Sequence, residues 1–410
     1  MIRGREFRLA IVTMLAAAAA ILLVGGAPSA GAAEMSVATP TPAPTPAPNV
    51  MSAYVWAGPY GEYFNGPFTS VTICESGTAN CQTLHAILVD TGSSGLRIFG
   101  ALNHLRLTPV TASDGSRVAE CMPFGSLTTW GRVAYADVKL GGEPVISNMP
   151  IQLINPNYPT IPAACTGGAP VAQSPTQLGY NGILGVGLWG PDCGDVCTAP
   201  GPQNPWMYYR CKGGACSAAS LANDKQVQNP VALLPEDNNG VVLKMPAIST
   251  SGAPAVMGKL VLGINTRGNN RLGGAFVYRT DGAGNIATTF DDATMDGFLD
   301  TGSNALFFDS GAIPQCDPAL APGFYCPPAG LVLGAINTGR DGSASGEVFF
   351  NVANALALAA TGNKAFSDVA GTFGGSFFDF GLPFFFGRNV FTGIEGQTTP
   401  GAGKGPFFAY

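Results

Sequence analysis

The stretch that decides the fold is ILVDTGSSGLRIF, residues 87–99, because its pattern returns as GFLDTGSNALFF at residues 297–308. Both copies place apolar residues before Asp-Thr-Gly-Ser and an apolar segment after it. A further apolar segment containing glycine follows each copy: YNGILGVG at residues 180–187 and FFFGRNVF at residues 384–391. One Asp-Thr-Gly is a common surface turn, whereas two copies in matching contexts indicate an internal repeat. The sequence therefore predicts two halves built on one plan.

The repeated tetrapeptide places a carboxyl in a tight turn at the end of an apolar strand. Glycine permits backbone angles that other residues avoid, and the serine hydroxyl can hydrogen-bond the nearby carboxylate. A twofold relation between the halves would bring Asp90 and Asp300 together, and two adjacent carboxyls share a proton over a wide pH range. One can then act as general base on a water while the other donates to a carbonyl oxygen. This chemistry hydrolyses an amide without a metal ion, a cofactor or a covalent intermediate.

The composition favours a β protein and argues against nucleic-acid binding. The 410 residues include 56 Gly and 33 Pro, only 11% are charged, and the formal net charge is −6. An acidic balance with no cluster of Lys and Arg is unlike a nucleic-acid-binding surface. Short apolar runs separated by Gly, Pro, Asn and Asp are typical of strands joined by turns. We therefore expect an all-β fold, with helix confined to residues 218–234, broken at Pro230, and to residues 352–360.

The N-terminal sequence indicates export. Three arginines among the first eight residues precede an apolar run at residues 9–24 and then small residues, an order typical of a secretory signal peptide. We expect a signal peptide at residues 1–33, with an uncleaved membrane anchor as the alternative. Residues 34–50 contain proline at alternate positions and predict an extended spacer. The protein is thus expected to be secreted, periplasmic or on the cell surface, with no transmembrane segment in the mature chain.

Ten cysteines, all after the predicted signal peptide, indicate disulfides, which an oxidising compartment favours. Two pairs with short spacing are expected to staple local hairpins: Cys74 with Cys81, and Cys316 with Cys326. The other six leave the connectivity open. They are a possible fifth pair, Cys121 with Cys165, and a cluster of four, Cys193, Cys197, Cys211 and Cys216. A zinc site is the alternative for that cluster, but its spacings differ from those of structural zinc sites, and we expect no metal there.

The two motifs resemble those of bilobal, pepsin-like aspartic peptidases, and the chain is similar, more narrowly, to secreted bacterial relatives of pepsin. The resemblance covers most of the chain, and it implies that residues 180–187 lie behind the first motif aspartate and residues 384–391 behind the second. It implies two pseudo-twofold-related β-barrel lobes around a central cleft, at residues 51–235 and 236–410, each carrying one motif. It also implies that Asp90 and Asp300 are the catalytic pair. The residues expected to support them are Thr91, Gly92, Ser93, Thr301, Gly302 and Ser303.

A second set of residues resembles the flap that closes over substrate in this family. FGSLTTWG at residues 124–131 matches the flap hairpin, and Phe124, Gly125 and Ser126 are the residues expected to contact substrate. Phe124 stands where tyrosine is usual, so the flap lacks that hydroxyl. Arg97 stands where a tryptophan that supports the flap is usual.

The resemblance implies a secreted aspartic endopeptidase, a monomer that acts on polypeptides, works best at acidic pH and needs no cofactor. The alternative is a catalytically weak or inactive protein on a peptidase scaffold that binds peptide, glycan or cell-wall ligands. The altered flap favours this alternative. So does the short stretch at residues 34–50, which leaves no room for the usual inhibitory propeptide.

Overall fold

The computed structural model describes residues 47–99, 102, 104–125, 127–167 and 169–410. This part of the chain is an all-β structure with short helices, as predicted. The predicted signal peptide, and all but residues 47–50 of the predicted spacer, lie outside the described residues. No helix within the described ranges is long and apolar enough to cross a membrane.

We group the strands into a first half, before residue 235, and a second half, after it. The first half contains β1 (Val50–Val55), β2 (Pro67–Cys74), β3 (Cys81–Asp90), β4 (Ser94–Phe99), β5 (Thr108–Pro109), β6 (Arg117–Phe124), β7 (Leu127–Lys139), β8 (Ile146–Ile154), β9 (Gly182–Val186), β10 (Tyr208–Lys212) and β11 (Ala215–Ala218). The second half contains β12 (Gly240–Lys244), β13 (Val256–Leu262), β14 (Val277–Arg279), β15 (Ile286–Phe290), β16 (Ala293–Leu299), β17 (Leu306–Phe307), β18 (Leu331–Thr338), β19 (Ser345–Val352), β20 (Ala370–Gly371), β21 (Phe377–Phe380), β22 (Asn389–Gly393), β23 (Thr398–Thr399), β24 (Gly403–Lys404) and β25 (Phe407–Ala409).

The helices are single turns or little more. The α-helices are α1 (Ala163–Thr166), α2 (Pro175–Leu178), α3 (Ala355–Ala360) and α4 (Leu382–Phe385), and the 3₁₀ turns are η1 (Gly194–Cys197), η2 (Asn223–Lys225) and η3 (Pro230–Leu233). Helix was predicted at residues 218–234, which was wrong for all but η2 and η3. Pro230 cannot continue a helix, and the buried Gln226 side chain instead bonds the backbone of Gly194. The second predicted helix is confirmed in part: it starts later, at Ala355, behind an Asn354 cap.

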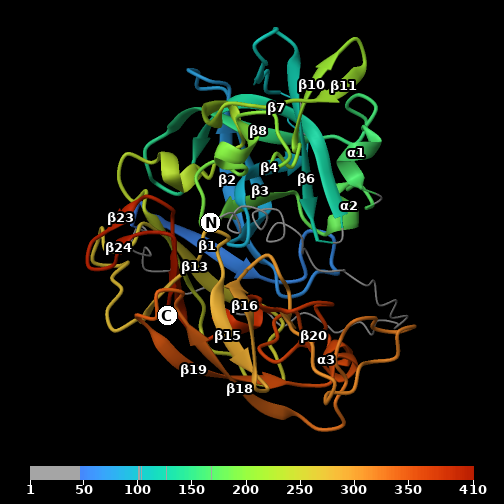
Figure 1. Ribbon diagram of the computed structural model, residues 1–410, viewed down its shortest axis with the longest axis vertical. Coiled ribbons are helices and arrows are strands. Elements are labelled where there is room, and N and C mark those ends of the chain that lie inside the picture. The colour runs from blue at the N-terminus through green and yellow to red at the C-terminus, as the bar shows by residue number, and fades with distance from the viewer. Residues whose placement is uncertain (1–46, 100–101, 103, 126, 168) are drawn as a thin grey trace, which may run out of the picture.

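One strand pair joins the two halves into a common sheet. β1 pairs antiparallel with β13 along its whole length, from Val50 opposite Val261 to Val55 opposite Val256. The first half's strands continue from β1 through β2, β3 and β9, and those of the second half continue from β13 through β12, β22 and β25. A separate sheet of the second half has the order β19-β18-β15-β16-β21-β17-β20. Figure 1 shows β1 and β13 between the upper, first-half strands and the lower sheet.

Each Asp-Thr-Gly-Ser motif begins where a strand buried on both faces ends. The last five residues of β3, up to Asp90, are all buried, as in strands with neighbours on both faces. β9 runs parallel to β3 and places Gly185 opposite Asp90. In the second half, β16 ends at Leu299, and β21 runs parallel to it with Phe380 opposite Leu299. The two aspartates therefore end equivalent parallel strand pairs.

The segment beside Asp300 is not the one expected from the sequence. Residues 384–391 contribute to α4 and to β22, and β22 pairs with β12. The neighbour of β16 is β21, which is followed by Gly381. A Cβ at Gly381 would collide with the carbonyl oxygen of Ala305, so only glycine fits there. The sequence FFDF of β21 holds an aspartate between phenylalanines, and a search for uninterrupted apolar residues before glycine therefore favours the later segment.

All ten cysteines form disulfides in the structure. The two predicted staples are confirmed, since Cys74–Cys81 and Cys316–Cys326 are bonded and the first pair lies directly opposite in the β2–β3 ladder. The six cysteines whose pairing was left open form three further disulfides: Cys121–Cys165, Cys193–Cys197 and Cys211–Cys216. Five disulfides are typical of proteins that fold in an oxidising compartment.

Candidate active site

The two Asp-Thr-Gly-Ser turns hold their carboxyls in the same way. The Gly92 N–H donates to Asp90 Oδ1 over 2.8 Å, and the Ser93 hydroxyl donates to Asp90 Oδ2. In the second turn, the Gly302 N–H donates to Asp300 Oδ1 over 2.7 Å, and the Ser303 hydroxyl donates to Asp300 Oδ2 over 2.9 Å. The predicted support by glycine and serine is therefore present in both halves.

The threonines of the motifs tie the two turns together. The Thr91 N–H donates to Thr301 Oγ1, and the Thr301 N–H donates to Thr91 Oγ1, over 3.1 and 3.0 Å. Each hydroxyl then donates across the junction, Thr91 to the Leu299 carbonyl and Thr301 to the Val89 carbonyl. These four reciprocal bonds fix the position of one half's turn relative to the other.

The crossed threonines bring the two aspartates together, as the repeat predicted. The Gly92 N–H lies 3.2 Å from Asp300 Oδ1, so it contacts the carboxyls of both halves. A Cβ at Gly92 would lie 2.6 Å from Asp300 Oδ1, and one at Gly302 would lie 2.8 Å from Asp90 Oδ1. Glycine is needed in each motif because the partner carboxyl occupies the space of a side chain.

The environment of this pair favours a retained proton. Asp90 is 2% exposed and Asp300 is 6% exposed. Burial, and next the charge of Asp90, hold the pKa of Asp300 well above its ordinary range. The buried Tyr63, from the β1–β2 connection, also lies near the pair: burial and then the charges of Asp300 and Asp90 raise its pKa. The pair can thus hold one proton between two carboxyls while its hydrogen-bond donors stay in place.

The predicted flap is a β-hairpin formed by β6 and β7. Phe124 pairs with Leu127 across the turn, and Gly125 has a positive φ of 38°. Thr128 is tied to the segment that follows α1, donating its N–H to the Pro170 carbonyl. The Phe124 side chain is only 2% exposed, and its ring lies 5.5 Å from the Arg97 guanidinium. The side chain of Ser126, the third predicted flap residue, lies outside the described residues.

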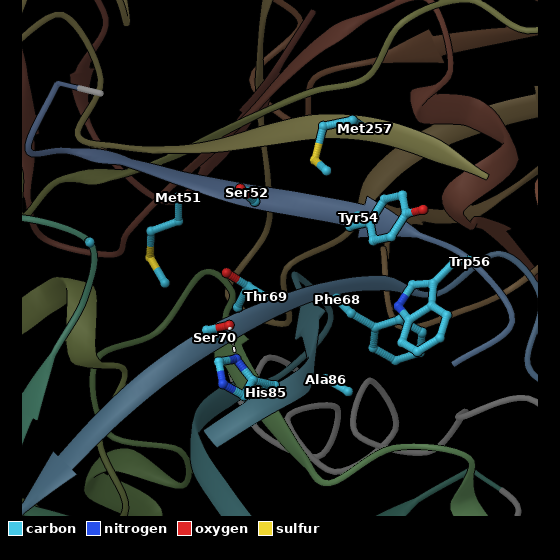
Figure 2. Close-up of a pocket in the computed structure, with 11 residues that line it drawn as sticks. Met51, Ser52, Tyr54, Trp56, Phe68, Thr69, Ser70, His85, Ala86 and Met257 are labelled. Carbon is cyan, nitrogen blue, oxygen red and sulfur yellow. Dashed lines mark hydrogen bonds between the residues drawn. The ribbon is translucent and has the colours of Figure 1, made fainter. Parts of the chain in front are cut away.

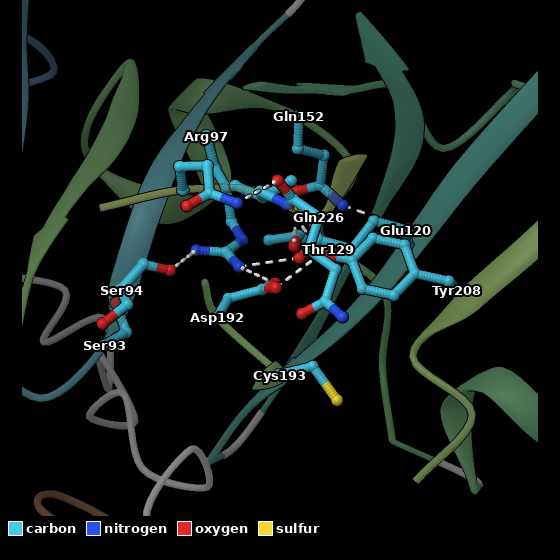
Figure 3. Close-up of polar contacts among 12 residues, drawn as sticks. Ser93, Ser94, Arg97, Glu120, Thr129, Gln152, Asp192, Cys193, Tyr208 and Gln226 are labelled. Carbon is cyan, nitrogen blue, oxygen red and sulfur yellow. Dashed lines mark hydrogen bonds and ion pairs between the residues drawn. The ribbon is translucent and has the colours of Figure 1, made fainter. Parts of the chain in front are cut away.

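Arg97 forms a buried cluster with two carboxyls behind the hairpin (Figure 3). One of its nitrogens, Nη2, lies 2.6 Å from Glu120 Oε1 and 2.7 Å from Asp192 Oδ2, and all three side chains are fully buried. Tyr208 donates to Asp192 Oδ1 over 2.5 Å and accepts from the Val227 N–H. The cluster therefore links β4, which follows the first motif, to β6 of the hairpin and to residues 192 and 227.

The cluster holds two carboxyls against one guanidinium. Burial, and next the charge of Glu120, hold the pKa of Asp192 well above its usual range. The guanidinium pKa of Arg97 is raised: burial opposes its charge, but Glu120 and Asp192 outweigh that effect. We infer that Arg97 stays charged and that the Glu120–Asp192 pair retains one proton at acidic pH.

Several residues at the site were not predicted from the sequence. Tyr63, Glu120 and Asp192 lie outside the repeated motif, and they reach the site only when segments distant in the sequence fold together. The one signal available was Arg97 in an otherwise apolar segment, because a buried arginine requires acidic partners. Its partners are 23 and 95 positions away in the sequence, too far for spacing to reveal them.

A separate pocket of about 470 Å³ lies beside β1 (Figure 2). It is bordered by Tyr54, Trp56, Phe68, His85 and Met257, and its lining is mainly apolar. Neither motif aspartate lines it. We therefore do not assign it to the chemistry of the carboxyl pair. Within the described ranges no group of three or more His, Cys, Asp or Glu is arranged to hold a metal ion.

Comparison with known proteins places the chain in a family without assigning it an activity. No curated protein matches the sequence. One family model matches residues 45–410, which is nearly all of the described chain, and it is described as a protein of unknown function. The chain belongs to this family, DUF3443.

Proposed function

We propose that the protein is a secreted aspartic endopeptidase with a bilobal, pepsin-like arrangement, in which Asp90 and Asp300 activate a water molecule. The observation that carries the proposal is the pairing of the two carboxyls through crossed threonine bonds, with the Gly92 N–H in contact with both aspartates. In both motifs, the serine hydroxyl and the glycine N–H bond the aspartate, and the two carboxyls lie together. This convergence of two equivalent motifs supports a catalytic role. The five disulfides support export.

The proposed mechanism follows from the shared proton. Asp90, as the carboxylate, takes a proton from the water as it attacks the scissile carbonyl carbon. Asp300, which burial and the charge of Asp90 keep protonated, donates to the carbonyl oxygen. When the tetrahedral intermediate collapses, the C–N bond breaks, Asp90 gives its proton to the leaving amine nitrogen, and Asp300 regains a proton from a hydroxyl of the diol as the new carboxyl group forms. The Ser93 and Ser303 hydroxyls keep each carboxyl in its plane throughout.

The substrate is proposed to be an extended polypeptide held between the halves, under the β6–β7 hairpin. Phe124 brings no hydroxyl to the hairpin, so we expect apolar side chains to be preferred around the scissile bond. The Arg97 cluster supports the hairpin from behind, because Glu120 belongs to β6 and its partners belong to the surrounding elements.

The second candidate function is binding of a peptide, glycan or cell-wall ligand without hydrolysis. Two observations favour it. Phe124 is 2% exposed and brings no hydroxyl to the site, and the two motif aspartates, Asp90 and Asp300, are only 2% and 6% exposed. A protein that binds denatured casein at pH 4 and leaves it intact would fit this candidate.

The test is an assay on denatured haemoglobin or casein from pH 3 to 7, with and without pepstatin. The proposal predicts cleavage that is greatest at acidic pH and is abolished by pepstatin. Cleavage that is unaffected by pepstatin and greatest at pH 7, or no cleavage by the folded protein, would contradict it.

A further inference from the structure

A third buried carboxyl, Asp379, lies behind Asp300. It belongs to β21, between Phe378 and Phe380, and its side chain is fully buried. Within the described residues, neither of its oxygens has a hydrogen bond of standard geometry. Burial holds the pKa of Asp379 well above its ordinary range, and the nearby Ser303 hydroxyl opposes this effect only in part. An unpaired buried carboxyl costs free energy, and a site that keeps one uses it or offsets it elsewhere.

The equivalent position in the first half shows which kind of side chain the fold accepts at position 379. Asp379 lies opposite Phe298 and Phe307, which are two residues before Asp300 and seven after it. At the same register in the first half is Ile183, opposite Leu88 and Arg97, two residues before Asp90 and seven after it. Ile183 is fully buried and apolar. The fold therefore accepts a hydrocarbon at this register, and the carboxyl of the second half breaks the symmetry of the pair.

The hydroxyl of Ser303 connects Asp379 to the pair. Ser303 donates to Asp300 Oδ2 over 2.9 Å and also acts on the Asp379 carboxyl. If Asp379 is neutral, its O–H can donate to Ser303 Oγ, which leaves the Ser303 hydrogen for Asp300. If Asp379 is ionised, it competes for the Ser303 hydrogen and adds a negative charge beside Asp300.

We propose that Asp379 is a positioning residue that controls the protonation of Asp300 through Ser303. This inference rests on the proposed function, because it concerns the same carboxyl pair. The titratable groups that act on one another around Asp379 and Asp300 are these two carboxyls, Asp90 and the buried Tyr63. The strands on either side of β21 present Phe298 and Phe307 at this register, so no cation faces Asp379 from them.

The direction of the effect follows from these contacts. Burial raises the pKa of both Asp300 and Asp379, so both carboxyls ionise above their ordinary range, on the alkaline side of the pH profile. There, an Asp379 carboxylate raises the pKa of Asp300 by its charge and by withdrawing a hydrogen-bond donor. A neutral side chain at position 379 removes both effects, so Asp300 loses its proton at lower pH. The alkaline limb of activity, where the pair loses its shared proton, therefore moves to lower pH.

Two variants test this, Asp379→Asn, which is neutral and similar in shape, and Asp379→Ile, which copies Ile183. Glu347→Gln, an exposed carboxyl on β19, is the control. We expect both position-379 variants to move the alkaline limb of kcat/KM toward lower pH by about half a unit or more, and the control to keep the wild-type profile. Profiles of both variants that superimpose on the wild type would overturn the inference.

A second measurement separates this inference from the proposed function. The free energy of unfolding is followed against pH for the wild type, Asp379→Asn, Asp300→Asn and the double variant. If the two carboxyls are coupled, Asp379→Asn changes the pH dependence less in the Asp300→Asn background than in the wild type. Coupling without any hydrolysis would reject the peptidase and keep the inference. Hydrolysis with strictly additive pH effects would keep the peptidase and reject the inference.

Discussion

The backbone N–H of Thr91 donates to the Thr301 hydroxyl over 3.1 Å, and the Thr301 N–H donates to the Thr91 hydroxyl over 3.0 Å. Thr301→Val would leave the Thr91 N–H and the Val89 carbonyl buried without partners. We expect a loss of about 2–4 kcal/mol in the free energy of unfolding, measured by denaturant titration. Thr301→Ser, which keeps the hydroxyl, is the control. Equal stability of the valine and serine variants would mean that these bonds do not hold the halves together.

The role of Gly381 is tested by a pair of glycine substitutions. A Cβ at Gly381 collides with the Ala305 carbonyl oxygen, whereas a Cβ at Gly375 makes ordinary contacts with Phe373 and Phe377, the nearest at 3.6 Å. Neither glycine has a positive φ. Gly381→Ala should therefore lower the melting temperature markedly and Gly375→Ala should change it little. If both are tolerated equally, the close packing of β21 against the second motif is not as described.

The buried Arg97 cluster gives a third prediction. Arg97→Met leaves Glu120 and Asp192 buried without a cation, and such a loss typically costs about 3–5 kcal/mol of stability. The control is Arg210→Met, because Arg210 pairs with Asp114 at 3.8 Å on the surface and such a pair contributes about 1 kcal/mol or less. Chemical unfolding of both variants checks the contrast. An Arg97→Met protein as stable as Arg210→Met would show that the cluster does not support the hairpin.

Stability should also depend on pH through Asp368. This buried residue has one unpaired oxygen, and burial raises its pKa to about 6. The folded state therefore holds a proton that the unfolded chain releases at lower pH. The resulting stabilisation is complete below the unfolded pKa, near 3.9, and is lost as the pH rises through about 6. Asp368→Asn should lose little stability at pH 4 and gain relative to the wild type by pH 7. A difference between the two proteins that does not change from pH 4 to pH 7 would contradict this.

The sequence was sufficient for the parts of the site that lie in contiguous motifs. Asp90 and Asp300 were predictable because the same four residues recur with matching apolar flanks, and the hairpin at Phe124 was predictable because residues 124–131 resemble the flap of pepsin-like peptidases. Cys74 and Cys81 were predictable as a pair because they are close in sequence and lie on adjacent strands.

The rest of the fold and of the site depends on contacts between segments far apart in the sequence. Such contacts cannot be recognised from one sequence alone. β21 was missed because Asp379 interrupts its apolar pattern, and this interruption is the feature that distinguishes the second half. The helix predicted before Pro230 failed because Gln226 bonds to Gly194, a tertiary contact that overrides local preference. The acidic partners of Arg97 come from two other segments and become evident only in the folded chain.

The most direct test of the central claim is hydrolysis of denatured casein at acidic pH by the wild type, Asp90→Asn, Asp300→Asn and the Glu347→Gln control, with folding of each checked by its melting temperature. The account predicts that both motif variants fold and lose at least about 10³-fold in kcat/KM, while the control retains wild-type activity. Normal hydrolysis by a folded Asp90→Asn or Asp300→Asn variant would contradict it.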